Sequence, residues 1–545
     1  MKKQNVTHLL ALVFAITMIF SCQLALAEQA GTMEYGSAEE ILSRDFSKHI
    51  GISFAGVQVV EGLDYTTGND YYKHFSNLFN ISYDVQGLQY RDWARSLSTW
   101  INSEDLPDWS VWNFNAGDAA NYAEQELVKK LPDDWRVKYP NLAKVADLCE
   151  ANAYYEEKLG GMYYLFRPQY GTGYPAKNLS SSISLYIRTD YAMQAGYDLS
   201  KNLESGKITI SEFMDYCRAV KAAGICEYPW WNYTGRVGVF LGLCASHSGV
   251  AAGYTANAYY RGEDGQYHWG PGEEDSGIKA ALGMMKQAYD EGLLYSDFYA
   301  LATDEDAEHF YGKGDCAALV AEGDAAYFDR YAQQMQELLG VSFWDAATVL
   351  VLTDNEGICH GDPNVNFWAC NILNPDMDDE KLDRILTLWD YSCTDEGQLE
   401  IRLGLKGIDW DFDESGNPVS FLTDTEFGNV ENKYTATRPI YSSMVSQGAD
   451  FNFINPAYSN EARDLMTRLY LTRSDCYSAD GQSVDWELYS YSSNLLSAAN
   501  FTYHDEFANL LTQAGDFSAN YDAWVKDKMS LIQPVLDDMN AQLAQ

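Results

Sequence analysis

The sequence predicts an α/β protein that contains two sheets. Short apolar runs typical of strands alternate with amphipathic helical segments from about residue 50 onward, an order that favours parallel sheets. The chain has 545 residues, which at roughly 150 residues per domain is more than one sheet and its helices require. We therefore expect two α/β sheets, and no internal repeat is visible.

The first half of the chain begins this alternation. The spacing of apolar residues predicts helices near 93–101 and 119–131. Thr209 and Glu212 have the spacing of a capping box at the start of another helix, which Gly224 is placed to end. The strand-like runs in this half lie at 110–114, 161–166 and 183–187.

The second half continues the same pattern. One helix is expected at 276–291, followed by Gly292, and another at 324–339, followed by Gly340. The later helices are expected at 378–392, at 394–403 and at the C-terminus, where Pro534 is expected to kink the helix. The strand-like runs lie at 317–320, 347–352 and 367–372.

Residues 1–27 have the features of a signal peptide. A basic start and an apolar run at 9–20 precede Ala25–Ala27, the small-residue pattern of a cleavage site. The alternative is a lipoprotein signal, in which Cys22 becomes the lipid-modified first residue. Both interpretations place the mature chain outside the cytoplasm, and the polar, acidic segment 28–48 is expected to be a tether.

The charge balance excludes several classes of partner. Asp and Glu number 79 against 37 Lys and Arg, which gives a formal net charge of −42. This excess repels phosphate backbones and anionic lipid head groups, so we expect no nucleic acid and no generic membrane surface as partner. The 40 Tyr and 14 Trp residues combine flat apolar faces with polar tips, which favours a ligand with C–H faces and many hydroxyls.

No catalytic, cofactor or metal motif is present in the sequence. There is no GxGxxG, Walker loop, GxSxG or HExxH, and the eight histidines are not spaced as metal ligands. We therefore expect no cofactor, no metal and no catalytic residues. Of the ten cysteines, the nine beyond Cys22 lack CxxC spacing, which argues against a disulfide framework and a zinc site but leaves one bridge open.

One acidic segment was considered as a calcium loop. Asp409, Asp411 and Asp413 alternate as at the start of an EF-hand loop. Glu414 and Ser420, however, stand where that loop requires Gly and Glu. A hairpin turn is therefore expected here.

Seven segments, in this order, resemble the extracellular solute-binding proteins of carbohydrate ABC transporters, in particular the maltodextrin-binding type and its long Gram-positive relatives. The segments are LPDWSVWN at 106–113, GGMYYLF at 160–166, LYIRTDY at 185–191, the helix at 209–221, the run at 310–320, WDYSCTDEGQ at 389–398 and GLKGIDWD at 404–411. The aromatic insert near Pro229 and the low lysine content depart from the family pattern, so the identity of the ligand does not carry over.

The resemblance implies a two-lobed, periplasmic-binding-protein-like clamshell of type II, with a hinge of several chain crossovers and the solute in the cleft. Lobe one is expected at 46–180 and 345–440, and lobe two at 181–344 and 441–545. The implied function is binding of a solute, foremost an oligosaccharide, and its delivery to the permease subunits of an ABC importer. A peptide ligand or a secreted glycoside hydrolase are the alternatives. We expect a monomer that meets the membrane only through a lipid on Cys22.

The resemblance also suggests where the ligand binds. Pyranose rings pack their C–H faces on aromatic rings, while their hydroxyls need fixed polar partners. Trp112, Asn113 and Asn115 follow the LPD motif at the position of contact residues in the maltodextrin-binding type. Trp112 is the first candidate for a sugar platform, and a role in the core is the alternative.

A second group of candidates lies farther along the chain. Glu227, Trp230 and Trp231 belong to a segment similar to another contact segment of that type. Successive side chains of a strand point to opposite faces, so one of the two tryptophans is expected to face the cleft. The remaining candidates are Phe166, Arg167, Glu322, Phe367, Trp368 and Trp410.

Overall fold

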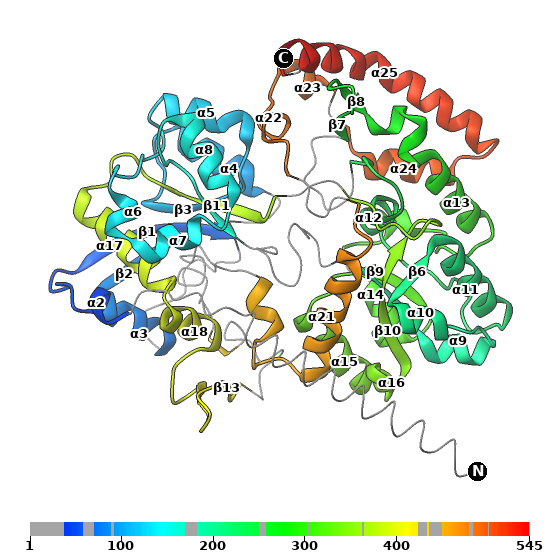
Figure 1. The fold of residues 1–545 in the computed structure, drawn as a ribbon, viewed down its shortest axis with the longest axis horizontal. Helices are drawn as coiled ribbons and strands as arrows, with labels where there is room; N and C mark the ends of the chain where they lie inside the picture. Colours follow the sequence, from blue (N-terminus) through cyan, green and yellow to red (C-terminus); the bar gives the residue numbers. More distant parts are fainter. Residues whose placement is uncertain are drawn as a thin grey trace.

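The computed structural model describes residues 38–57, 70–88, 92–168, 183–249, 258–303, 305–361, 365–422, 433–434, 449–478, 483–499 and 501–543. The described chain forms two α/β lobes, which stand side by side in Figure 1. The core of the first lobe takes residues from 38–166 and 365–422, and the core of the second lobe takes residues from 185–359 and 453–539. The expected two-lobed fold is thus present.

The first lobe is built on a five-stranded sheet in the order β2-β1-β3-β11-β4. β1 runs parallel to β2 and β3, with Phe54 opposite Trp109, whereas β11 is antiparallel to both of its neighbours, with Cys370 opposite Trp112 and Phe166. The strands are β1 (Ile50–Val57), β2 (Ile81–Leu88), β3 (Trp109–Trp112), β4 (Leu165–Pro168) and β11 (Phe367–Leu373).

Helices with local start signals surround this sheet. The side chain of Asp378 accepts a hydrogen bond from Lys381 N at the start of α17, and Thr394 accepts one from Gly397 N at the start of α18. The helices are α2 (Ala38–Leu42), α3 (Asp70–Phe79), α4 (Trp93–Asn102), α5 (Ala116–Glu124), α6 (Trp135–Lys138), α7 (Pro140–Ala146), α8 (Glu150–Leu159), α17 (Asp379–Ser392) and α18 (Asp395–Leu403).

The second lobe is built on a four-stranded sheet in the order β6-β10-β5-β9. β10 is parallel to β6, and β5 is antiparallel to both β10 and β9, with Ser184 opposite Ala321. The strands are β5 (Ser184–Arg188), β6 (Lys207–Thr209), β9 (Ala318–Ala321) and β10 (Ala347–Thr353).

The helices of the second lobe follow the predicted start and stop signals. The capping box of Thr209 and Glu212 is formed at α11, and Gly340 ends α15 with a φ of 67°. The main helices are α9 (Thr189–Ala195), α10 (Ser200–Ser205), α11 (Ile210–Ala222), α12 (Thr234–Cys244), α13 (Ile278–Asp290), α15 (Ala325–Leu339), α16 (Phe343–Ala346), α21 (Asn460–Ser474), α24 (Tyr503–Thr512) and α25 (Phe517–Gln542).

Smaller elements complete the described chain. They are β7 (Tyr259–Arg261), β8 (Tyr267–Trp269), α14 (Glu305–Glu308), β12 (Trp410–Phe412), β13 (Pro418–Ser420), α22 (Trp486–Tyr489), α23 (Asn494–Ala498) and the short helical turns η2 (Gly270–Gly272), η3 (Glu274–Ser276), η4 (Phe298–Ala300), η5 (His309–Lys313) and η7 (Ala449–Phe453).

The expectation of parallel sheets is wrong for two central strands. β11 and β5 are antiparallel to their neighbours because the chain enters each of them from the other lobe. A strand that begins at the edge where its neighbours end must run in the opposite direction to them. The sheets are therefore mixed.

Three of the expected boundaries also differ. β10 pairs with β5 and β6 in the second lobe, although residues from 345 were expected in the first. Residues from Ala38 are not a tether, because Ala38 and Ile41 on α2 are buried in the first core. Trp486 and Tyr489 pack on the first lobe, although 441–545 was expected in the second. The expected signal peptide at 1–27, with Cys22, lies outside the described residues.

Candidate functional site

Each sheet has one edge where most of its strands end. In the first sheet, β1, β2, β3 and β4 end at the edge where β11 begins, since Phe367 pairs with Pro168. In the second sheet, β6, β9 and β10 end at the edge where β5 begins. The chain leaves β4 for β5 and leaves β10 for β11, so both connections join these two edges. We call them the facing edges.

A third contact between the lobes is made by a short helical segment. Cys359 N donates to Cys476 O at 2.9 Å and Ser478 N donates to Cys359 O at 2.9 Å, which binds the chain after α21 to the connection between β10 and β11. The chain then reaches α22, where Trp486 stacks on Tyr154 of the first lobe with ring centroids 5.4 Å apart.

The same segment is also bound to the second lobe. Tyr267 Oη of β8 donates to Asp485 Oδ2 at 3.0 Å, directly before α22. On the other side, the Tyr489 ring lies parallel to Phe114 with centroids 6.5 Å apart. α22 therefore connects the two lobes, and in Figure 1 it lies between them.

The first-lobe edge presents amides and an aromatic ring after β3. Asn113 and Asn115 are exposed, and Phe114 between them is half-buried. Asn115 caps α5, with its Oδ1 accepting from Gly117 N at 2.9 Å and its Nδ2 donating to Asp118 Oδ2 at 3.0 Å. Burial raises the pKa of Asp118. This edge can offer amide groups and a carboxylate to hydroxyls, and part of a ring to C–H groups.

The second-lobe edge presents an ion pair after β9. Arg236 Nη2 on α12 donates to Glu322 Oε1 at 2.9 Å, and their side chains are 12% and 30% exposed. Tyr186 Oη donates to the Glu322 carbonyl, which fixes the backbone there. Figure 1 shows α12 and β9 on the side of this lobe that faces the first lobe.

Asp324 lies two residues after Glu322 and is the N-cap of α15. Its Oδ1 accepts hydrogen bonds from Ala326 N at 3.0 Å and Tyr327 N at 3.2 Å. Burial is the main cause that raises the pKa of Asp324 to about 6, and the nearby charge of Glu322 acts in the same direction.

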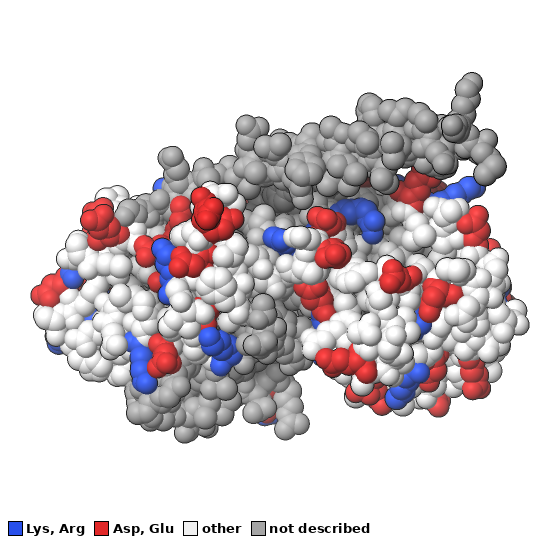
Figure 2. Space-filling model, turned by 90° about the horizontal axis from the view of Figure 1, so that it is seen from below, with Lys and Arg blue, Asp and Glu red and all other residues white. Residues whose placement is uncertain are grey.

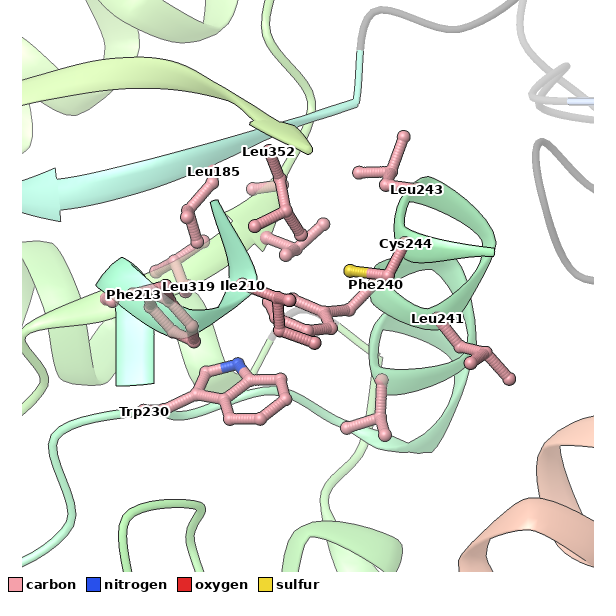
Figure 3. Packing of buried hydrophobic residues seen from close by; sticks show 14 of the residues in the cluster. Leu185, Ile210, Phe213, Trp230, Phe240, Leu241, Leu243, Cys244, Leu319 and Leu352 are labelled. Carbon is pink, nitrogen blue, oxygen red and sulfur yellow. The ribbon is translucent and has the colours of Figure 1, made fainter. Parts of the chain in front are cut away.

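Two of the expected sugar platforms lie in the cores instead. Trp112 is 1% exposed, and its ring packs 5.4 Å from Tyr164. Trp230 is 0% exposed, lies against Phe240 at 4.4 Å and donates through Nε1 to Asn232 Oδ1 at 2.7 Å, within the packing that Figure 3 shows. Their assignment as exposed platforms is therefore contradicted, because neither ring has a free face.

Trp231 is also buried in the core of the second lobe, at 7% exposed, so it is not an open platform either. Its ring lies between Tyr295, at 3.8 Å, and His309, at 3.6 Å. Trp231 N donates to Ala318 O at the beginning of β9, which is the end opposite the facing edge. The preceding Glu227 is exposed on the same connection.

The weaker candidates fall into two groups. Phe166 and Phe367 are buried with centroids 4.5 Å apart, and both rings pack against Phe114. Arg167, the second-last residue of β4, is 3% exposed. Trp410 is buried and donates through Nε1 to Gly404 O at 2.8 Å, so it is a core residue. The backbone of Trp368 lies in β11, and its side chain is outside the described part of the chain.

The acidic segment near Trp410 forms the expected hairpin. Asp413 Oδ1 accepts from Ser415 N at 2.9 Å and Asn417 N at 2.8 Å, between the paired strands β12 and β13. Within the residues that the structure describes, no group of three or more His, Cys, Asp or Glu side chains is placed to hold a metal. The nine described cysteines are free thiols.

Sequence reasoning missed Phe114, Arg236 and Tyr489. Phe114 lies between the two predicted residues Asn113 and Asn115, but the larger Trp112 next to them is the stronger candidate for a sugar platform in the sequence alone. Arg236 carries no local signal, since its partner Glu322 is 86 positions away. Tyr489 reaches the site only because the chain crosses back to the first lobe at α22.

Two lobes joined by several crossings, with hydrogen-bonding side chains on both facing edges, define the class of two-lobed solute-binding proteins. A family model described as bacterial extracellular solute-binding protein matches residues 70–359, a span that includes parts of both lobes. The chain belongs to this family, whose members are binding proteins rather than enzymes. No curated protein matches the sequence.

Solved structures agree with the fold. An extracellular solute-binding protein from Bifidobacterium longum subsp. infantis has a TM-score of 0.64 at 12% identity, covering 91% of this chain and 98% of that one. A human-milk-oligosaccharide (HMO)-binding, ABC-transporter-associated protein from Bifidobacterium longum infantis has a TM-score of 0.61 at 13% identity, with coverage of 90% and 97%. FusA of S. pneumoniae in complex with kestose has a TM-score of 0.59 at 14% identity, with coverage of 90% and 99%.

None of the described helices is both long enough and apolar enough to cross a membrane.

The buried positions of Trp112 and Trp230 predict a loss of stability in their alanine variants. Removing a fully buried Trp should lower the free energy of unfolding by about 3–5 kcal/mol, since it leaves a cavity. Chemical denaturation of Trp112→Ala and Trp230→Ala measures this, with the exposed Val137→Ala as a control that should change little. Variants as stable as the wild type would contradict the core assignment.

The raised pKa of Asp324 predicts a pH-dependent stability. Its folded-state pKa of about 6 exceeds its ordinary value of 3.8, so the stability that the protonated carboxyl contributes is fully present below pH 3.8 and is lost as the pH rises through about 6. Asp324→Asn keeps the capping oxygen without the charge. Between pH 4 and 7 the free energy of unfolding of the variant should rise by on the order of 2 kcal/mol relative to that of the wild type. One pKa unit corresponds to about 1.4 kcal/mol, and solvent partly screens the half-buried site.

Urea unfolding at a series of pH values measures this difference. Asp516→Asn at the exposed start of α25 serves as the control, because Asp516 also caps a helix through its side chain. A gain that does not vary with pH in Asp324→Asn would contradict the assignment.

Proposed function

We propose that the protein binds an oligosaccharide between the facing edges and delivers it to the permease subunits of an ABC importer. Membership of the solute-binding family supports capture and delivery. Proteins with the same fold include an HMO-binding protein, a protein in complex with kestose, an N-glycan transport protein and an alginate-binding protein, which supports a glycan as the ligand class.

The observation that carries the proposal is the chemistry of the two edges. The first edge places the exposed amides of Asn113 and Asn115 on either side of the half-buried Phe114. The second edge carries the ion pair of Arg236 and Glu322 after β9. Amides, carboxylates and guanidinium groups suit hydroxyls, while the Phe114 and Tyr489 rings suit the C–H faces of a pyranose.

Binding across both edges also gives a mechanism for signalling occupancy. A solute that contacts both lobes favours the arrangement in which both contacts are made, and it shifts the population by its difference in affinity for the two arrangements. The importer would then distinguish loaded from empty protein by the relative positions of the lobes. Asn113 and Glu322 are the residues on which we place this dual contact.

The amino-terminal segment completes the proposal. We propose export by the signal at 1–27, followed either by release or by lipid anchoring through Cys22, and action as a monomer outside the cell. Mass spectrometry of the exported protein distinguishes the two forms, since it should start at Glu28 or carry a lipid-modified Cys22. An exported chain that keeps Met1 would contradict both.

A thermal-shift panel of neutral oligosaccharides, acidic oligosaccharides and peptides tests the proposed ligand class. A ligand present at 100 times its Kd should add roughly 2.7 kcal/mol of stability. We expect stabilisation by at least one oligosaccharide, without release of reducing ends, and a loss of about tenfold in affinity for Asn113→Ala measured by calorimetry.

Asn121→Ala is the matched control, because Asn121 is also an exposed asparagine and lies in the last turn of α5. Stabilisation by peptides alone would replace the glycan with the peptide alternative. Reducing ends released on incubation would replace binding with hydrolysis.

A further inference from the structure

The ion pair of Arg236 and Glu322 is held in place by surrounding structure. Arg236 lies in the first turn of α12, and Glu322 follows β9 directly. Tyr186 Oη binds the Glu322 carbonyl, and α15 begins two residues later with its cap at Asp324. The backbone at both members of the pair is therefore held by neighbouring elements.

The exposure of the two side chains is unequal. Arg236 is 12% exposed and Glu322 is 30% exposed, so the carboxylate is the more accessible member. The guanidinium Nη2 is already engaged at 2.9 Å by Glu322 Oε1. A ligand that approaches this edge meets a neutralised arginine behind a carboxylate.

The other described charged groups around the facing edges are also mostly acidic. The acids Asp118, Glu322 and Asp324 are joined by Asp354 after β10. The described bases are Arg236 and the buried Arg167 and Arg473, the last of which donates from Nη2 to Ser184 Oγ at the start of β5. The face shown in Figure 2 has red groups spread over both lobes and fewer blue ones. A carboxylate on a ligand would be repelled at long range, and the Arg236 guanidinium that it would meet is already paired with Glu322.

We propose that Glu322 is a specificity-determining residue, which engages Arg236 and thereby restricts the site to uncharged glycans, excluding uronates. The inference rests on the proposed function and adds the charge of the ligand to it. Glu322 acts in two ways: it engages the guanidinium of Arg236, which is less buried than that of Arg473 at the same edge, and it adds its own negative charge. An uncharged sugar is unaffected by either and can donate hydroxyl protons to the Glu322 carboxylate.

The test compares each neutral sugar with a charged form of the same sugar. Maltotetraose, cellotetraose and mannotetraose are each titrated beside the derivative whose primary hydroxyls are oxidised to carboxylates. For a neutral sugar that binds, the wild type should prefer it at least about tenfold over its oxidised form. Glu322→Gln, which keeps the shape of the side chain and removes the negative charge beside Arg236, should reduce or reverse this preference.

Two control variants separate the pair from the general charge of the protein. Glu204→Gln removes one exposed negative charge on α10 and should keep the wild-type preference. The double variant Glu322→Gln with Arg236→Gln should not gain affinity for the oxidised sugars, because the gain expected in Glu322→Gln requires the positive charge of Arg236. Circular dichroism of each variant checks that the fold is retained.

The outcomes distinguish the inference from the proposed function. Equal affinity of the wild type for a neutral sugar and its oxidised form, or an unchanged preference in Glu322→Gln, would overturn the role of Glu322 while leaving glycan binding intact. Absence of binding to every neutral and oxidised sugar of the panel would overturn both. Loss of the preference in Glu204→Gln would assign the exclusion to net charge and overturn the role of the pair.

Discussion

The reversed directions of β5 and β11 constrain most of the remaining structure. Each is an interior strand, β5 between β10 and β9 and β11 between β3 and β4, and each is antiparallel to both neighbours. Interior strands satisfy their backbone groups on both sides, so their direction cannot change without breaking two ladders of hydrogen bonds. Because each begins where its neighbours end, the connections between lobes must run from one facing edge to the other.

This connectivity makes the two lobes depend on one another. The first sheet is completed by β11 only after the chain has formed all four strands of the second sheet. The second core is completed by α21, α24 and α25 after the chain has returned from the first lobe. The facing edges are thus fixed by the fold, while the side chains on them are free to vary. On this fold the proposed binding residues belong to short segments such as 113–115 and to single side chains such as Arg236 and Glu322.

The sequence was informative about local structure because the signals for strands and helix ends are local. Six strand-like runs lie within a few residues of β3, β4, β5, β9, β10 and β11, and the capping box at Thr209 is formed. The direction of β5 and β11 was not predictable from apolar patterns, since a buried strand has the same apolar pattern whether it is parallel or antiparallel to its neighbours. The lobe boundary at 345 was misplaced for the same reason, because β10 looks like any buried strand.

The candidate site was predicted only in part. Asn113 and Asn115 lie on a facing edge and Glu322 lies on the other, but Trp112, Trp230 and Trp410 are in the cores. A large aromatic residue after a strand suits a core and a sugar platform equally, and only the packing of distant segments decides between them. The same holds for Arg236 and Tyr489, whose positions depend on contacts with Glu322 and Phe114 far away in the sequence.

The central claim is that the solute lies between the facing edges and contacts both lobes. A crystal structure of the protein with a bound neutral oligosaccharide tests it most directly. The account predicts sugar hydroxyls within hydrogen-bonding distance of Asn113 or Asn115 and of Glu322 in the same molecule, with a ring face against Phe114 or Tyr489. An oligosaccharide bound to one lobe alone, or bound away from both edges, would contradict it.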